Sequence, residues 1–256
     1  MIQKEQFILI LYLISSIFFI IAIKRLGKIH TARQGNLLSA IGMLIAILAT
    51  VLKLNSFDPK FIIIGLLIGT IIGLISALKV EMTSMPEMVA IFNGFGGGAS
   101  ALVATSEYLQ KGSGIESFGL MTIMLAVIIG TITFTGSFIA FGKLKGFISG
   151  QPITYPAQNL LNGIIVICAI IASYLTIINP DLILYFYIVF SIGMLLGILS
   201  VIPIGGADMP VVISLLNSYS GIAAAAAGFV LKNHALVVSG ALVGASGIFL
   251  TNIMCK

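Results

Sequence analysis

The sequence predicts an all-α polytopic membrane protein with about nine transmembrane helices. Of its 256 residues, 59% are hydrophobic and only 8% are charged, whereas a soluble domain carries roughly 25% charged residues. Mostly apolar runs recur along the chain, each long enough to cross about 30 Å of hydrocarbon as a helix. The weak alternating pattern of a membrane β-barrel does not occur in the sequence. We expect one transmembrane helical domain over residues 1–256.

The predicted spans follow one another through short connections. They cover residues 7–23, 37–54, 61–78, 85–105, 118–141, 158–178, 182–202, 208–231 and 234–254. The second and third spans are rich in Ile, Leu and Gly and are interpreted as packing elements. Gly65, Gly69 and Gly73 recur at steps of four in the third span, which predicts a face that another backbone approaches closely.

Local sequence signals mark the start of the fourth span, and its apolar interior contains an Asn. Ser84 and Glu87 form a capping-box pattern, and Pro86 stands in the first turn, so a helix is predicted to begin at Met85. Asn93 then lies about 12 Å along the axis, close to mid-bilayer.

In the fifth span, threonines and Ser137 give a hydroxyl-rich side, and such hydroxyls often bond carbonyls of their own helix. The short sequence NPD at 179–181 predicts a tight hairpin between the sixth and seventh spans.

The basic residues favour one orientation in the membrane and no nucleic-acid partner. The formal net charge is +5, but the thirteen Lys and Arg are scattered between spans instead of forming one basic face. With the N-terminus outside, eight of them are cytoplasmic and five are external, so the positive-inside rule predicts N-out and C-in. The cytoplasmic set is Lys24, Arg25, Lys28, Arg33, Lys79, Lys143, Lys145 and Lys256.

Residues 85–104 recur in altered form at 209–228. A shift of 124 residues superimposes Met85-Pro86 on Met209-Pro210 and Asn93 on Asn217, together with several small residues. Four spans separate the two copies, so both helices are predicted to run in the same direction with their Asn side chains at one depth, as in a parallel repeat. A chance match between two helices rich in Ala and Gly is the alternative explanation.

Two features of the repeated helices need interpretation. Residues 94–99, GFGGGA, fit a dinucleotide-binding pattern, but no strand is predicted before them, so close helix packing, or room for water beside Asn93, is favoured. Asn93 and Asn217 could either join helices by hydrogen bonds or line a polar path through the bilayer. No Asp, Glu, Lys, Arg or His is predicted at mid-depth, and no metal site is predicted.

At these residues the sequence resembles a known family. VEMTSMPEMVAIFNGF, TFTGSFIAFGKL and GGADMPVVISLLNSYSGIAAAAAGF, followed by SGALVGASG, are similar to the membrane domain of the beta subunit of proton-translocating NAD(P) transhydrogenase. The resemblance covers essentially the whole chain. The soluble NADP(H)-binding domain that follows the ninth span in the family is expected to be absent from residues 1–256, so this chain is expected to contain no soluble nucleotide domain. The resemblance implies a subunit of an oxidoreductase and translocase that couples inward proton movement to hydride transfer from NADH to NADP⁺. NAD(H) and NADP(H) are expected on partner domains, so this chain is expected to hold no cofactor and no hydride-transfer site.

The resemblance also implies site residues. Asn217 matches a channel Asn of the family, Ser137 a polar residue of the same region, and Asp208 an acid that couples the channel to the NADP(H) domain. Several members carry His where this chain has Asn93, so the titrating group is expected on an alpha-subunit helix or on water. The predicted proton path comprises Asn93, Asn217, Ser137 and Ser220. The predicted coupling residues are Asp208, Glu81, Glu87 and Lys256.

The partners implied are alpha subunits, an NADP(H)-binding domain, the lipid of a bacterial inner membrane and a second copy of the assembled unit. One alternative is a secondary transporter or ion channel with a midplane site between the repeated Asn helices. A structural membrane scaffold is the third hypothesis.

Overall fold

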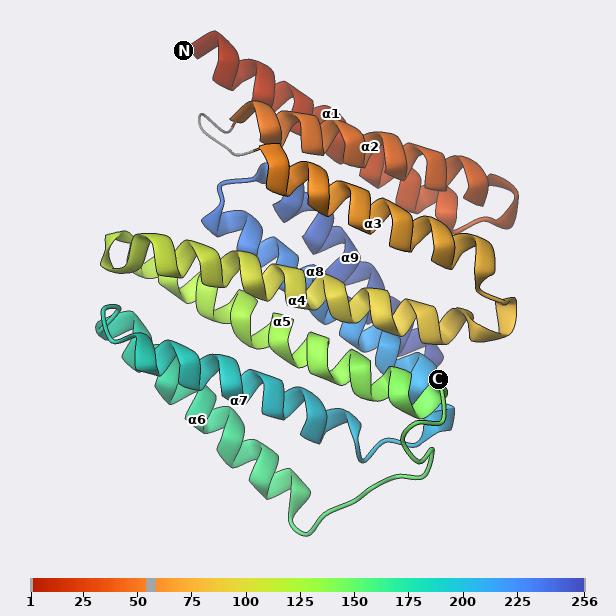
Figure 1. The fold of residues 1–256 in the computed structure, drawn as a ribbon, viewed down its shortest axis with the longest axis vertical. Coiled ribbons are helices and arrows are strands. Elements are labelled where there is room, and N and C mark those ends of the chain that lie inside the picture. Colours follow the sequence, from red (N-terminus) through yellow and green to blue (C-terminus); the bar gives the residue numbers. More distant parts are fainter. Residues whose placement is uncertain (1, 54–58, 256) are drawn as a thin grey trace. The chain divides into compact units, whose positions relative to one another are not determined.

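The computed structural model describes residues 2–53 and 59–255, and within these ranges the chain is helical, without strands. Nine helices in the described part are long and apolar enough to cross a membrane, which confirms the predicted fold class (Figure 1). They are α1 (Ile2–Leu26), α2 (Ala32–Lys53), α3 (Pro59–Lys79), α4 (Met85–Lys111), α5 (Ser117–Leu144), α6 (Gln158–Ile178), α7 (Ile183–Val201), α8 (Met209–Val230) and α9 (His234–Met254).

Helix boundaries agree closely with local sequence signals. Helix α4 begins at Met85, as the Pro and the preceding polar residues predict, after a 3₁₀ turn at Met82–Ser84. Helices α6 and α7 are separated only by residues 179–182, so the predicted hairpin is confirmed. The chain divides into two compact units, Met1–Met88 and Val89–Lys256.

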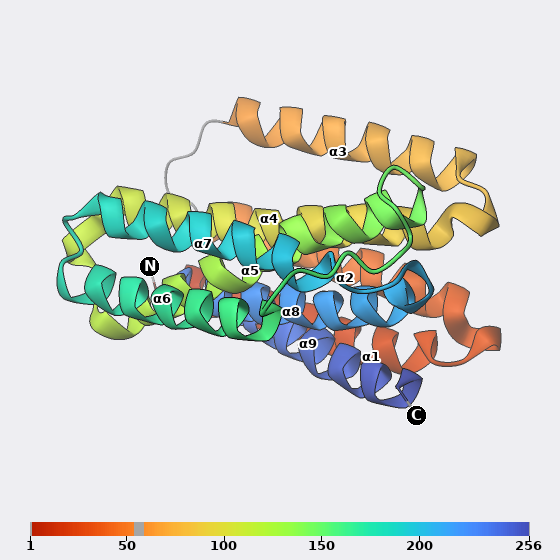
Figure 2. The ribbon, with the colours of Figure 1, turned by 90° about the horizontal axis from the view of Figure 1, so that it is seen from below.

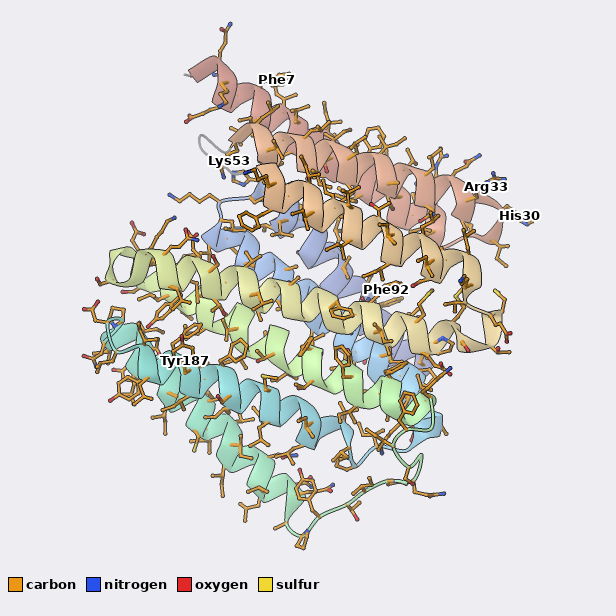
Figure 3. All side chains as sticks on the ribbon, in the orientation of Figure 1. Phe7, His30, Arg33, Lys53, Phe92 and Tyr187 are labelled. Carbon is orange, nitrogen blue, oxygen red and sulfur yellow. The ribbon has the colours of Figure 1, made fainter. Side chains whose placement is uncertain are left out.

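In the first unit, α1 and α2 form an antiparallel hairpin around small and hydroxylated residues. Ser15 Oγ donates to the carbonyl of Gly42 over 2.7 Å, and the Tyr12 hydroxyl lies 3.1 Å from Thr50 Oγ1. A methyl group on Gly42 would lie 3.1 Å from Phe18 Cβ, so the glycine lets the two helices approach. His30 lies in the exposed turn that joins these helices, and Arg33 lies in the first turn of α2 (Figure 3).

Within the first unit, the glycine face predicted on α3 does not contact another helix. Nothing in the described structure lies within 4 Å of a methyl group placed on Gly65, Gly69 or Gly73. The spacing rule places the three glycines on one face of the helix, but it cannot say whether a second backbone is present to use that face.

In the second unit, α5 is the central element. It packs against α6, α7 and α8 (Figure 2), and its side chains are buried along the whole length of the helix. One apolar cluster lies at the α5 N-terminal end, where the Tyr108 and Phe186 rings stack with centroids 4.3 Å apart. Phe186 therefore belongs to the core, although the run Tyr185–Tyr187 resembles an interfacial belt. A second cluster around Met209 and Val201 fills the opposite end.

Candidate functional site

A polar cluster joins α4, α5 and α8 inside the second unit, and its centre is Asn93. The Asn93 carboxamide is 7% exposed. Its Nδ2 donates to Ser137 Oγ of α5 over 2.9 Å, and its Oδ1 accepts from Ser220 Oγ of α8 over 2.8 Å. Both functional atoms of the amide are therefore satisfied by side chains from two other helices. The structure brings together Asn93, Ser137 and Ser220, which are three of the four residues predicted for the proton path.

Glycines one turn from Asn93 make this close approach feasible. A methyl group on Gly97 would lie 2.7 Å from Thr133 Cβ, and one on Gly130 would lie 2.6 Å from the carbonyl oxygen of Gly97. These positions cannot hold a larger residue without separating α4 from α5. A methyl group on Gly94 would lie 3.2 Å from Ser137 Cβ. The interpretation of GFGGGA as a packing motif is thus confirmed for the glycines of this motif that face α5.

The hydroxyl groups of α5 divide into two kinds. Thr131 and Thr133 donate to carbonyls four residues earlier, over 2.6 and 2.7 Å, as predicted. Thr135 also reaches across to the carbonyl of Met194 in α7, over 2.8 Å. Ser137 is fully buried and instead accepts the amide proton of Asn93. Ser137 therefore differs from the threonines in bonding to a polar side chain of another helix.

Asn217 lies near the cluster but takes part through its backbone. Its carbonyl oxygen lies 2.9 Å from Ser220 Oγ, so the one hydroxyl proton of Ser220 is within reach of two acceptors, this carbonyl and Asn93 Oδ1. The Asn217 carboxamide is half-buried and has no hydrogen-bond partner among the residues that the structure describes. It is therefore the polar group of this region with unused donors and acceptors.

Helices α4 and α8 run in the same direction, as the repeat predicts. The Asn93–Ser220 hydrogen bond joins the N-terminal third of α4 to the middle of α8, and the C-terminal ends of both helices line one pocket through Glu107 and Val230. Ser220 is one turn beyond Asn217, so Asn217 lies within about 5 Å of the depth of Asn93. The two Asn residues therefore lie within about one helical turn of each other along the helix axes, and their common depth in the membrane stays a prediction.

The cluster forms a directional chain of hydrogen bonds that contains no titratable group. The Ser220 hydroxyl donates to Asn93, whose amide nitrogen donates to Ser137. A neutral carboxamide neither gains nor loses a proton near pH 7, so a proton cannot pass through Asn93 itself. Chemically, the cluster can hold three helices together, and it can release hydroxyl and amide groups to water when the helices move.

The predicted coupling residues lie in both units. Glu81 is exposed, Glu87 is half-buried in the first turn of α4, and Glu81 Oε2 accepts from Thr83 Oγ1 over 3.4 Å. Asp208 is exposed in front of α8, and although it occupies the N-cap position its side chain does not cap that helix. Lys256 lies outside the described residues.

Sequence reasoning missed a buried lysine near Asp208. Lys143, in the last turn of α5, is only 4% exposed. Its Nζ donates to the carbonyls of Gln151, Ile202 and Ile204 over 3.2, 2.6 and 2.7 Å. Three ammonium protons thus meet three carbonyl oxygens, which fixes the α5–α6 and α7–α8 connections to one another. The only sequence feature that pointed to this lysine was its position just before a long loop. The count of basic residues treats such a lysine as an ordinary cytoplasmic cation.

Comparison with known proteins places these residues in a family. The family model described as NAD(P) transhydrogenase beta subunit matches residues 8–256. The NAD(P) transhydrogenase subunit beta of Rhodospirillum rubrum is 44% identical over 252 residues, which covers 96% of this chain and 54% of the relative. A second protein of that name, from a particular strain of the same species, matches with the same figures. The chain therefore spans about half the length of the curated relatives it matches.

Proposed function

The chain belongs to the NAD(P) transhydrogenase beta subunit family, and from this premise we propose that it forms the membrane path that couples inward proton movement to hydride transfer from NADH to NADP⁺. The observation that supports this most directly is the buried cluster of Asn93, Ser137 and Ser220, which is polar, interhelical and close to mid-span. The nucleotides bind to partner domains in this proposal, and this chain supplies the path and its gate.

In the proposed mechanism, the cluster is the closed state of the gate. Asn93 is hydrogen-bonded to the hydroxyls of Ser137 and Ser220, so these groups are not available to form hydrogen bonds with water molecules along a path through the bilayer. Opening separates α4 from α5 and α8 and exposes hydroxyl, amide and Asn217 groups to a file of water molecules. The water carries the proton, and the titrating group is on an alpha-subunit helix or on the water itself.

The energy of the interhelical hydrogen bonds is comparable with the energy released by one proton, which makes such a gate feasible. Each interhelical hydrogen bond contributes about 0.6 to 2 kcal/mol in a membrane, so breaking two costs about 1 to 4 kcal/mol. One proton that crosses about 200 mV releases about 4.6 kcal/mol. The membrane potential therefore suffices to drive the gate, and it is enough to shift the ratio of two redox cofactors by roughly three decades.

The proposal assigns coupling to groups at the ends of α4 and α8. Asp208 leaves its carboxylate uncommitted to the α8 N-terminus, so it is available to a docked NADP(H) domain. Glu81, Glu87 and Lys256 are proposed to share this role. We place the assembled protein, with its alpha subunits and a second copy of the unit, in a bacterial inner membrane.

The test is reconstitution of the whole activity. The chain is co-expressed with its alpha subunit and an NADP(H)-binding domain in membrane vesicles, and hydride transfer is measured with and without an uncoupler. We expect transhydrogenation whose rate changes when the uncoupler collapses the proton gradient. No transhydrogenation by the complete set would contradict the proposal.

A variant of Asn217 separates the proton path from the redox step. We expect Asn217→Leu to abolish the response to the uncoupler, because it removes the amide that faces the opened path. Direct hydride exchange between the isolated soluble domains should be unchanged. Unaltered coupling in this variant would show that Asn217 only packs between helices.

A further inference from the structure

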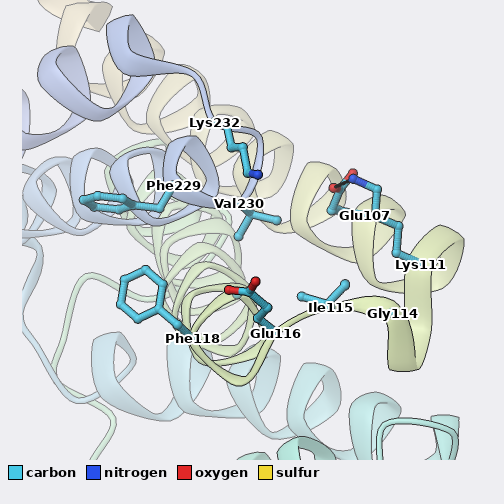
Figure 4. Close-up of a pocket in the computed structure, with 10 residues that line it drawn as sticks. Glu107, Lys111, Gly114, Ile115, Glu116, Phe118, Phe229, Val230 and Lys232 are labelled. Carbon is cyan, nitrogen blue, oxygen red and sulfur yellow. Dashed lines mark hydrogen bonds and ion pairs between the residues drawn. The ribbon is translucent and has the colours of Figure 1, made fainter.

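A pocket at the opposite end of α4, α5 and α8 from Asp208 carries a mixture of charges and aromatic rings. Its cavity measures about 250 Å³. Its polar wall comes from Glu107, Lys111, Glu116 and Lys232, and its apolar wall from Phe118 and Phe229 (Figure 4). The volume is that of roughly eight water molecules in the liquid, which is more than a single ion needs. It is below the roughly 300 Å³ at which pockets for drug-sized ligands begin.

The charges favour a ligand that carries both signs. Two ammonium groups and two carboxylates line the same cavity, so a simple anion meets two carboxylates and a simple cation meets two ammonium groups. Glu107 and Lys111 form an ion pair, but a carboxylate has about four acceptor sites and an ammonium group has three donors, so both can bind further groups. The Glu116 side chain does not cap α5, although Glu116 occupies the N-cap position. A zwitterion of phosphate and primary amine matches this set.

The aromatic wall indicates that the ligand has an acyl chain. Phe118 is 64% exposed and Phe229 is 52% exposed, and their rings pack edge to face with centroids 6.3 Å apart. They belong to the first turn of α5 and the last turn of α8, so they lie where transmembrane spans end. Aromatic rings at this level of a membrane lie beside lipid headgroups and upper acyl chains.

We propose that this pocket binds the headgroup of a phosphatidylethanolamine-type lipid. Lys232 and Lys111 contact the phosphate, Glu116 and Glu107 accept hydrogen bonds from the primary ammonium group, and the first part of an acyl chain lies on Phe118 and Phe229. Phosphatidylcholine fits less well because its quaternary ammonium group has no N–H donor. Phosphatidylglycerol fits less well because it presents no cation to the two carboxylates.

The sequence contains no tryptophan, so one introduced Trp is a clean reporter of the adjacent lipid. The full chain carrying Phe229→Trp is reconstituted in vesicles that contain lipids brominated high on the acyl chain, and quenching gives the relative affinity for each headgroup. We expect phosphatidylethanolamine to be preferred over phosphatidylcholine by about threefold, the factor typical of one partly exposed charge pair. Phosphatidylglycerol should bind more weakly than either. A matched reporter, Phe249→Trp on the exposed face of α9, should show no preference.

Charge variants and a soluble competitor complete the test. Glu116→Gln should reduce the threefold preference to about one, whereas Asp181→Asn, an exposed acid outside the pocket, should leave it unchanged. Equal affinities for the three lipids at Phe229→Trp, or a preference that survives Glu116→Gln, would overturn the proposal. Displacement of the lipid by millimolar phosphoethanolamine would overturn the assignment to a lipid, since the acyl chain would then contribute nothing.

Discussion

At the scale of the residue, Asn93 has the role that its chemistry allows. A carboxamide has a donor and an acceptor at one end of a short side chain, so it can bridge two neighbours, and here it bridges Ser137 and Ser220. The sequence left two interpretations of this residue, which were helix attachment and lining of a path. In the proposed gate both apply, because the attachment seen in the structure is the closed form of the path.

The strength of one of these bonds can be measured directly. A double-mutant cycle of Asn93→Leu and Ser137→Ala should give a coupling energy of about 0.6 to 2 kcal/mol in the free energy of unfolding, measured by denaturant titration in mixed micelles. Asn252→Leu combined with Ser137→Ala is the control, because Asn252 is exposed on α9. Strict additivity of Asn93→Leu and Ser137→Ala would show that the bond contributes nothing to stability.

A larger loss of stability is expected when Lys143 is substituted. Lys143→Met removes three donors from carbonyls at the α5–α6 and α7–α8 connections. Because buried carbonyls are then left without partners, the free energy of unfolding should fall by about 2 to 5 kcal/mol. Thermal unfolding in detergent is the measurement, with exposed Lys24→Met as the control, for which no more than about 0.5 kcal/mol is expected. A loss as small as that of the control would mean that water replaces the ammonium group without cost.

At the scale of the element, the crossing of α4 and α5 decides the site. Gly97 and Gly130 allow the two backbones to meet, whereas a methyl group on Gly96 would have nothing within 4 Å. Gly96 and Gly97 are neighbours in α4, so substitutions at these two positions form a matched pair.

We expect Gly97→Ala to lower the free energy of unfolding by about 1 to 3 kcal/mol through overpacking, and to weaken proton coupling by moving Asn93 away from Ser137. Gly96→Ala should be neutral or stabilising by up to about 1 kcal/mol, because alanine favours a helix over glycine. Denaturant titration and the uncoupler response of both variants provide the comparison. Equal effects of the two substitutions would show that the crossing is loose.

The same helices show where sequence reasoning succeeds and where it stops. Hydropathy and turn residues predict the nine spans, and a shared spacing predicts that Asn93 and Asn217 lie at similar depth. Local patterns cannot give rotation about a helix axis, so they did not separate Asn93, which bonds to two helices, from Asn217, whose amide bonds to neither. They also missed Lys143, because its partners are backbone carbonyls, two of them about sixty residues away, and carbonyls are present at every residue.

At the scale of the whole molecule, the orientation in the membrane is a prediction from charge. Cys168→Ala leaves Cys255 as the single thiol, and Cys255 is exposed after α9. With the C-terminus in the cytoplasm, a membrane-impermeant maleimide should label Cys255 in inside-out vesicles and not in right-side-out vesicles. A Lys4→Cys substitution in a chain without the native thiols should give the reverse pattern. Labelling of Cys255 from the outer side would invert the assigned topology.

The central claim is that protons pass beside the Asn93 cluster during transhydrogenation, and the number of protons moved per hydride tests it most directly. In sealed vesicles of the complete complex, proton uptake and NADPH formation are recorded together for the native chain, Asn93→Leu and the control Asn252→Leu. The account predicts that Asn93→Leu uncouples or blocks proton uptake while hydride exchange between the soluble domains continues, and that Asn252→Leu behaves as the native chain. A native proton-to-hydride ratio and rate in Asn93→Leu would contradict it.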